Sequence, residues 1–315
     1  MPSSISKSLK NIIDVSEEKD EDLKNKLLEV SKREKAVLMA CIAPYVGKKV
    51  SPTRTLMAEM GISEEFAIEE AIERIKEKTD SSTLLLLLNS PGGFVSCSYK
   101  VARALRKSFK EIKVFVPHIA ASGGTLVALT GNEIVMGMMG QLSPLDPTST
   151  QKKRRVSAKG IVDGFQTVTE FFKKTSEEDA PYTYKVLAQK YDAEQLDSAI
   201  SALMLMESYA TEILIGSGYQ KKKAKEIAYT LVRGFRNHGE VINADKAKEM
   251  GLNVVRNTRY LEEWSLMRKW LGRHLLQSAD KHIIRYAISP DLCKDKKSKG
   301  KKSKKAKAQT ESGKQ

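Results

Sequence analysis

The feature that most constrains this sequence is a run of five leucines that ends at a chain-breaking turn. The run lies within Thr83–Leu88, follows two serines, and is followed at once by NSPGG at residues 89–93. Six residues are too few for a stable helix, and an apolar run without alternation is typical of a strand buried on both faces. The sequence therefore predicts a central parallel strand over Thr83–Leu88, with a glycine-rich turn at its carboxyl end.

The segments around this strand repeat the same order of elements. Helical spacing returns over residues 96–108, a second strand is predicted at Val114–Val116, and AASGG leads into another helical stretch. A third strand at Ile134–Met136 ends in the turn GQLSPLDPTS, and an earlier apolar run, Val37–Ala43, predicts a further buried strand. Strands that alternate with helices favour right-handed crossovers, so we expect an α/β fold with a mostly parallel sheet.

Helices are expected over most of the remaining chain. Residues 17–35 are highly charged and predict an exposed helical arm, and a helix is predicted to start at Ser63. Residues 160–231 have helical spacing, with Asp192 as an N-cap. A turn, a short helix and a strand are expected over 238–255, and a tryptophan-containing helix over 260–278. We expect four regions: an arm at 1–35, the main domain at 36–256, a helical extension at 257–290 and a tail at 291–315.

The charge of the chain is concentrated at its end. The formal net charge is +15, but residues 291–315 hold ten lysines against three acidic residues, a net +7. This tail is predicted to be disordered, and it has no interleaved aromatic residues. We expect at most weak contact with polyanions or a membrane surface, and no specific nucleic-acid binding. The run KKRR at residues 152–155 predicts a solvated loop, with attraction of acidic peptides or an anionic membrane as the alternative.

Several classes of protein are disfavoured by composition. No run of eighteen apolar residues occurs, and residues 1–10 have no apolar core, so we expect neither a transmembrane helix nor a secretory signal peptide. The three cysteines are widely separated and form no cluster with the four histidines. We therefore expect a reduced, cytoplasmic protein that needs no metal and no organic cofactor, with a peripheral position at the inner membrane surface as the alternative.

The two glycine motifs carry the chemistry that the sequence predicts. Each lies where a strand ends and a helix begins, a place where backbone N–H groups are free to face a ligand. The motif ASGG puts the Ser122 hydroxyl on the first turn of a helix. An N–H of Gly92 or Gly93, together with that of Gly123, would form an oxyanion hole beside it.

The sequence matches other functions of glycine-rich loops less well. Such turns also bind dinucleotides or are merely tight turns, but GxGxxG and GxxxxGK[ST] are both absent. The elbow GxSxG of α/β-hydrolases fails as well, because residue 120 is alanine. Phosphate binding is therefore not supported, and a serine nucleophile is favoured.

At these motifs the sequence resembles the Clp protease/crotonase-like superfamily. NSPGG is the form found in the Clp proteolytic subunit, and ASGG is similar to the motif of signal peptide peptidase A. SPLDP, followed far downstream by NHGEVINADKAKEMGL, most resembles the serine dehydrogenase proteinase family of ClpP-like proteins. The likeness covers residues 35–256 and implies stacked ββα units with a mostly parallel sheet and helical additions at both ends.

The resemblance also implies roles for individual residues. Ser122 matches the nucleophile, and Gly93 and Gly123 match the oxyanion donors. Asp146 lies within SPLDP, where Clp peptidases have their histidine, and His238 lies near the place of the Clp aspartate. The order Ser122, Asp146, His238 is the one described for the serine dehydrogenase proteinase family.

The identity of the base stays open at this point. Simple exchange of the two side chains on an unchanged backbone would place Asp146 next to Ser122, and a carboxylate is a poor base for a hydroxyl unless its pKa is raised. A Ser–Lys dyad, as in signal peptide peptidase A, is the second option, with Lys159, Lys173 or Lys174 as candidates. Asp146 and His238 also have purely structural interpretations, as a cap and as a turn residue.

The sequence as a whole predicts a serine endopeptidase that cleaves peptide bonds through an acyl-enzyme on Ser122. Because relatives form trimers and hexamers, the resemblance implies a homo-oligomer. Two alternatives belong to other classes: a catalytically impaired ClpP-fold interaction or scaffold protein, and a crotonase-type acyl-CoA enzyme.

Overall fold

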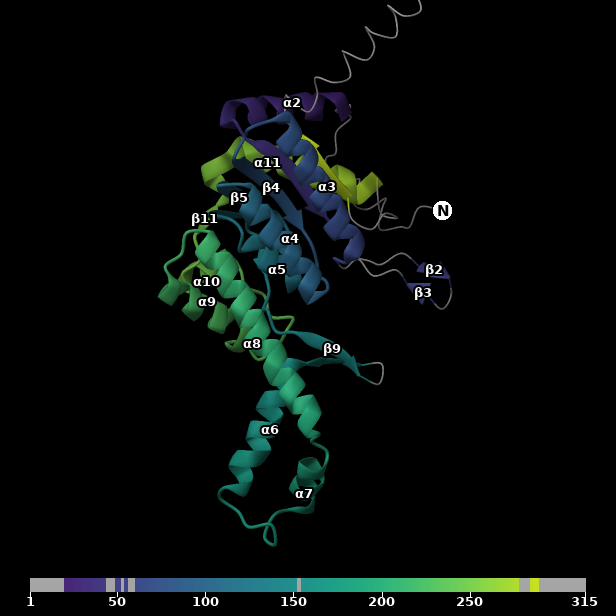
Figure 1. The fold of residues 1–315 in the computed structure, drawn as a ribbon, viewed down its shortest axis with the longest axis vertical. Coiled ribbons are helices and arrows are strands. Elements are labelled where there is room, and N and C mark those ends of the chain that lie inside the picture. The colour runs from purple at the N-terminus through teal and green to yellow at the C-terminus, as the bar shows by residue number, and fades with distance from the viewer. Residues whose placement is uncertain are drawn as a thin grey trace, which may run out of the picture.

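A computed structural model of the protein describes residues 20–43, 49–51, 54–55, 60–151, 154–277 and 284–288. The lysine-rich tail predicted to be disordered lies outside these residues, as do Lys152 and Lys153 of the KKRR run. The fold consists of a central sheet with helices on both faces and a helical arm that projects away from it (Figure 1).

The central sheet has six strands in the order β11-β7-β5-β4-β1-β12. All neighbouring strands pair in parallel except β12, which is antiparallel to β1. The predicted α/β fold with a mostly parallel sheet is confirmed. The strands of this sheet are β1 (Val37–Ile42), β4 (Thr83–Asn89), β5 (Glu111–Val116), β7 (Glu133–Met136), β11 (Val254–Arg256) and β12 (Ile284–Ile288).

The leucine run forms the middle of this sheet, as predicted. Strand β4 pairs with β1 on one side and with β5 on the other. Because side chains alternate between the faces of a strand, Leu84, Leu86 and Leu88 enter the core on one face. Leu85 and Leu87 enter the core on the opposite face. A run apolar at every position is thus what a strand covered on both sides requires.

Helices cover the two faces of the sheet unequally. The larger core packs against helices α3 to α6 and α8 to α10, and the smaller one against α2 and α11. The 3-10 helix Asn257–Tyr260 leads into α11. The helices are α2 (Asp20–Glu34), α3 (Ile62–Lys78), α4 (Val95–Ser108), α5 (Gly123–Ala128), α6 (Ala158–Phe172), α7 (Tyr182–Gln189), α8 (Ala193–Gly216), α9 (Lys221–Arg233), α10 (Ala244–Glu249) and α11 (Leu261–Gln277).

Two expectations at the ends of the chain are corrected. Helix α2 exists, but it is not an exposed arm, because Leu23, Leu27 and Val30 are buried in the smaller core with residues of α11. The predicted extension at 257–290 is not helical throughout, since α11 is followed by strand β12. Helix α2 is covered because it has a narrow apolar stripe to bury. Strand β12 forms because it pairs with the edge of the sheet at β1, which would otherwise be open.

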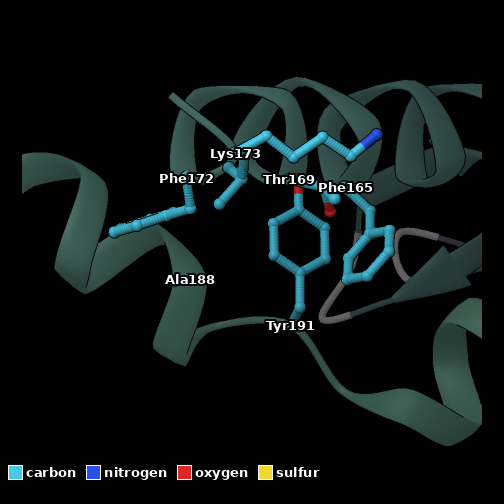
Figure 2. Close-up of a pocket in the computed structure, with 7 residues that line it drawn as sticks. Phe165, Thr169, Phe172, Lys173, Ala188 and Tyr191 are labelled. Carbon is cyan, nitrogen blue, oxygen red and sulfur yellow. The ribbon is translucent and has the colours of Figure 1, made fainter. Parts of the chain in front are cut away.

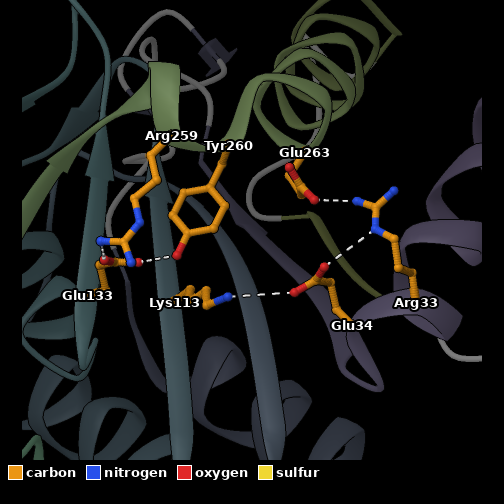
Figure 3. Close-up of polar contacts among 7 residues, drawn as sticks. All are labelled: Arg33, Glu34, Lys113, Glu133, Arg259, Tyr260 and Glu263. Atoms are coloured by element: carbon orange, nitrogen blue, oxygen red, sulfur yellow. Dashed lines mark hydrogen bonds and ion pairs between the residues drawn. The ribbon is translucent and has the colours of Figure 1, made fainter.

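A polar network joins α2, α11 and the sheet (Figure 3). Arg33 forms ion pairs with Glu262, at 2.6 Å, and with Glu263, so α2 and α11 are linked directly. Glu34 lies 3.6 Å from the ammonium of Lys113 on β5. These half-exposed pairs each contribute little on their own. Together with the buried stripe of α2, they fix how the two helices lie on the sheet.

Tyr260 in the same network predicts a pH dependence of stability. Its hydroxyl donates to Glu133, which also pairs with Arg259 at 2.8 Å. Burial, reinforced by the Glu133 contact, raises the pKa of Tyr260 to about 12 from its usual 10. The protonated Tyr260 hydroxyl therefore stabilises the folded state fully below about pH 10, and this contribution is lost as the pH rises toward 12. We expect the difference in urea midpoint between wild type and Tyr260→Phe to narrow over this interval; a constant difference would contradict the assignment.

The remaining elements lie outside the main sheet. Helices α6 and α7 and the amino-terminal part of α8 form the projecting arm (Figure 1). By length and composition alone, α8 would suit a membrane crossing, but core helices pass the same test, and six α8 residues are buried in the core. Three short pairs of strands complete the fold: β2 (Lys49–Ser51) with β3 (Arg54–Thr55), β6 (Ile119–Ala120) with β8 (Gln141–Leu142), and β9 (Thr148–Gln151) with β10 (Arg154–Ser157).

Candidate active site

A second, small layer of paired segments brings the predicted loops to one place. Ser90 bridges to Ala120, β6 pairs in parallel with β8, and Leu142 bridges antiparallel to Ile242. Because β6 and β8 are parallel, the chain leaves the layer at the same end after Ala120 and after Leu142. Because Ile242 pairs antiparallel with Leu142, the residues that precede Ile242 lie at this same end. The loops that carry Ser122, Asp146 and His238 share this end.

Ser122 occupies a strained turn between β6 and α5. Its φ of 51° lies in a region that residues other than glycine rarely adopt, and it directly precedes the first residue of α5. Its backbone N–H donates to the Ser143 hydroxyl at 2.8 Å. The side chain is half-buried. A sharp, strained turn at the start of a helix is the type of geometry that presents a nucleophilic serine in hydrolases.

Buried hydroxyls that no sequence motif predicts hold this turn in place. The Thr125 hydroxyl lies 2.7 Å from the carbonyl of Ala120 and 2.8 Å from that of Ser143, and it accepts the Ser143 N–H at 3.0 Å. Thr125 and Ser143 are both almost fully buried. They connect strand β6, the Ser122 turn and the loop after β8, so they act as positioning residues for Ser122.

The two glycine loops touch each other beside Ser122. A Cβ on Gly92, which has a φ of 107°, would lie 3.0 Å from Ser122 Cβ and 3.0 Å from the amide nitrogen of Gly123. A Cβ on Gly123 would lie 3.2 Å from the nitrogen of Gly93. Within the described residues, the amides of Gly93 and Gly123 have no hydrogen-bond acceptor. Ser122, Gly92, Gly93 and Gly123 are thus brought together, with two amides free to bind an anionic oxygen.

Asp146 is buried, with 4% of its surface exposed. One carboxylate oxygen accepts the backbone N–H of Lys159 at 3.0 Å, in the first turn of α6. The partial positive charge at a helix amino terminus stabilises a carboxylate at this place. This contact agrees with the capping role, and it leaves the second carboxylate oxygen for another donor.

His238 lies in the turn between α9 and α10 and is half-buried. Its Nδ1 is buried and has no hydrogen-bond partner among the described residues. In this part of the chain no hydrogen bond joins His238 to Ser122 or to Asp146. The three loops therefore lie at one end of the small layer, but the side chains of Ser122, His238 and Asp146 are not hydrogen-bonded to one another.

The alternative lysine bases have other partners. The Lys159 ammonium pairs with Asp163, and Lys173 pairs with Glu170 at 2.5 Å. Both pairs lie along α6 or just after it. Lys174 follows α6, and its backbone N–H donates to the Phe171 carbonyl at 3.1 Å. No contact of these side chains with the Ser122 turn occurs among the described residues.

A cavity of about 400 Å³ lies apart from these loops, on the projecting arm between α6 and α7 (Figure 2). Its wall is aromatic, and Phe165 meets Tyr191 edge-on with ring centroids 5.5 Å apart. Ordinary metal ligands are not clustered anywhere in the described ranges, where no group of three or more His, Cys, Asp or Glu side chains is suited to hold an ion.

A parallel sheet that ends in two facing glycine loops, with a serine in a strained turn between them, defines a ClpP-like α/β protein. The family model for ClpP-like SDH-type serine proteinases matches residues 60–304, and the chain belongs to this family. The predicted resemblance and fold class are confirmed.

Individual relatives extend this comparison. The chain is 31% identical over 192 residues to the uncharacterized protein MJ0137 of Methanocaldococcus jannaschii and 30% identical over 189 residues to its uncharacterized protein MJ1495. Each match spans 60% of this chain but only 59% and 58% of the relatives' lengths. Among solved structures, a mutant of the 1510-N membrane-bound stomatin-specific protease is 14% identical with a TM-score of 0.41, over 66% of this chain and 80% of that one.

Proposed function

We propose that this protein is a serine peptidase that hydrolyses peptide bonds through an acyl-enzyme on Ser122. One observation carries the proposal: Ser122 lies in a strained turn at the start of α5, beside the amides of Gly93 and Gly123, which have no hydrogen-bond acceptor among the described residues. A tetrahedral intermediate needs a nucleophile and hydrogen-bond donors at the same carbonyl group. Membership of a serine proteinase family supports the same reaction.

In the proposed reaction, His238 is the base and Asp146 orients it. His238 takes the proton of the Ser122 hydroxyl as its oxygen attacks the peptide carbonyl, and the resulting oxyanion accepts hydrogen bonds from the Gly93 and Gly123 amides. The imidazolium then gives its proton to the leaving amine. In the second half of the reaction, His238 takes a proton from water as the water attacks the ester, and then returns that proton to the Ser122 oxygen. Among the described residues, the buried Nδ1 of His238 has no hydrogen-bond partner, and the one hydrogen bond of the Asp146 carboxylate is made by only one of its oxygens. Both observations support this assignment, because Nδ1–H would donate to the other carboxylate oxygen.

Covalent labelling tests the nucleophile. A fluorophosphonate probe is expected to modify the wild-type protein at Ser122, because only an activated serine beside an oxyanion hole attacks phosphorus rapidly. Peptide mass spectrometry should find the label on Ser122 and none on the exposed Ser96, and Ser122→Ala should remain unlabelled. An unlabelled wild type that also lacks peptidase activity would rule the proposal out.

A second candidate is a ClpP-fold interaction protein that has lost its base. It is favoured by the lack of a hydrogen bond between Ser122 and any basic side chain in the described residues. This candidate predicts that His238→Ala and Asp146→Ala leave residual turnover unchanged. The labelling experiment separates the two, because a serine without a base reacts slowly with the probe.

A further inference from the structure

The backbone of Met60, two residues before α3, holds the NSPGG loop. The Met60 N–H donates to the Gly92 carbonyl at 2.8 Å, and the Met60 carbonyl accepts the Phe94 N–H at 3.0 Å. The peptide bond between Gly92 and Gly93 is planar and trans, so its N–H points opposite to its carbonyl. Because the Gly92 carbonyl points at Met60, the Gly93 N–H points away from Met60. These two hydrogen bonds thus set the direction of the Gly93 amide.

The Gly93 amide is the one that this loop can offer to an oxyanion. A Cβ on Gly123 would lie 3.2 Å from the Gly93 nitrogen, so the two glycine amides are neighbours. The Gly92 N–H, in contrast, already donates to the buried hydroxyl of Ser90 at 3.1 Å. The direction of the Gly93 N–H therefore matters for the proposed oxyanion hole, and Met60 controls that direction.

The Glu64 side chain binds the peptide group through which Met60 acts. Its carboxylate reaches back from the first turn of α3 and accepts the Gly61 N–H at 2.5 Å, while the Glu64 N–H donates to the Gly61 carbonyl at 3.0 Å. The Gly61 N–H and the Met60 carbonyl belong to one planar peptide group. One end of this group is therefore held by Glu64, and its other end binds the Phe94 N–H.

The burial of Glu64 is more than a helix cap requires. Reciprocal caps of this type are common at helix starts and work with exposed side chains. Glu64 has only 5% of its surface exposed, and burial of a carboxylate is costly unless it is well bonded. On the other side of Gly61, the Phe94 ring lies 3.9 Å from the position of a Cβ there. The carboxylate is thus enclosed where α3 meets the NSPGG loop.

We propose that Glu64 is a positioning residue of the oxyanion hole. Its carboxylate orients the peptide group between Met60 and Gly61, whose carbonyl holds Phe94 and with it the Gly93 amide. This role rests on the proposed peptidase function. Glu64 transfers no proton and does not touch the substrate. Because the Gly93 amide is needed most when negative charge develops on the substrate oxygen, its misalignment lowers kcat more than it raises KM.

Three substitutions of Glu64 test this role through kcat, KM and melting temperature. Glu64→Ala should lower kcat for peptide hydrolysis about 10- to 100-fold with KM nearly unchanged, less than the complete loss of an oxyanion donor. Glu64→Gln keeps an oxygen acceptor at the same reach and should retain most of the rate. Glu64→Asp keeps the charge on a shorter side chain and should resemble Glu64→Ala, and it serves as the second variant if Glu64→Ala does not fold.

Asp192→Ala is the matched control. Asp192 also caps a helix, since it accepts the Gln195 N–H at 2.9 Å, but it lies at the start of α8 in the projecting arm. Its loss should lower the melting temperature, as loss of a cap does, and leave kcat unchanged. An active wild type whose Glu64→Ala variant keeps its kcat, or whose Glu64→Gln is as slow as Glu64→Ala, overturns the role of Glu64 alone. An inactive, unlabelled wild type overturns the peptidase proposal and this role with it.

Discussion

His238→Ala is expected to lower kcat/KM for peptide hydrolysis about 10⁴-fold or more, because removal of the base leaves the Ser122 hydroxyl protonated at the moment of attack. Residual turnover would come from the oxyanion hole and substrate binding alone. Initial rates on a fluorogenic peptide over a wide range of enzyme concentrations measure a loss of this size. The melting temperature should change little, since His238 lies in a turn and its Nδ1 makes no hydrogen bond in the described residues.

Further variants decide whether the base is a histidine or a lysine. Catalytic residues that act as one unit are not additive, so Ser122→Ala combined with His238→Ala should be no slower than either variant alone. Lys173→Met is the control, because that ammonium pairs with Glu170 on the surface of the arm and should have no effect. Loss of activity in Lys159→Met, with His238→Ala still active, would replace the proposed triad by a Ser–Lys dyad.

Gly93→Ala is expected to destabilise the fold by about 3 kcal/mol or more, which is near the upper end for overpacking. The added Cβ would overlap the backbone nitrogen and oxygen of Met60 and lie 2.6 Å from its Cα. These are backbone atoms of a fully buried residue, held by the isolated bridge between Met60 and Gly93, so neither segment can shift easily. Urea unfolding at equilibrium measures the change.

The matched control for this variant is Gly239→Ala. The nearest atom to a Cβ there is Asn237 Oδ1 at 3.5 Å, an ordinary contact, so the free energy of unfolding should change by less than about 0.5 kcal/mol. If Gly93→Ala proves as stable as Gly239→Ala, the close approach of the NSPGG loop to Met60 is wrong. The geometry of the proposed oxyanion hole would then need revision as well.

The features predicted best from the sequence are those encoded locally. The leucine run forms β4 because burial on both faces needs an apolar side chain at every position. Asp192 caps α8 as predicted, accepting the Gln195 N–H at 2.9 Å. Both signals are contained within a few consecutive residues. Interactions of this range are the ones that periodicity and capping rules describe.

The features that were missed depend on contacts distant in sequence. Leu23, Leu27 and Val30 form a stripe with helical spacing, but the many charges around them predict an exposed arm. The stripe is buried because α11, which is distant in sequence, packs against it. The sequence did not indicate that β12 would pair with β1, since partner choice in a sheet is set by the whole fold.

The candidate site was predicted to a similar extent. Its glycines and Ser122 lie in recognisable motifs, and the structure brings them together. The supporting hydroxyls of Thr125 and Ser143 come from two separate segments with no motif of their own. A lone serine or threonine in a sequence gives no sign that it will be buried beside a catalytic turn, so these residues could be found only from the three-dimensional arrangement.

The pairing of β12 with β1 also has a consequence for how the chain is made. Strand β1 is apolar and buried at every position, and its outer edge pairs with β12, the last strand of the described residues. During synthesis β1 leaves the ribosome long before β12 is made, so for most of its elongation the nascent chain has an unpaired, aggregation-prone strand edge. We therefore expect shortened chains that end before Ile284 to need chaperones or to aggregate, although the loops around Ser122 are already present in them.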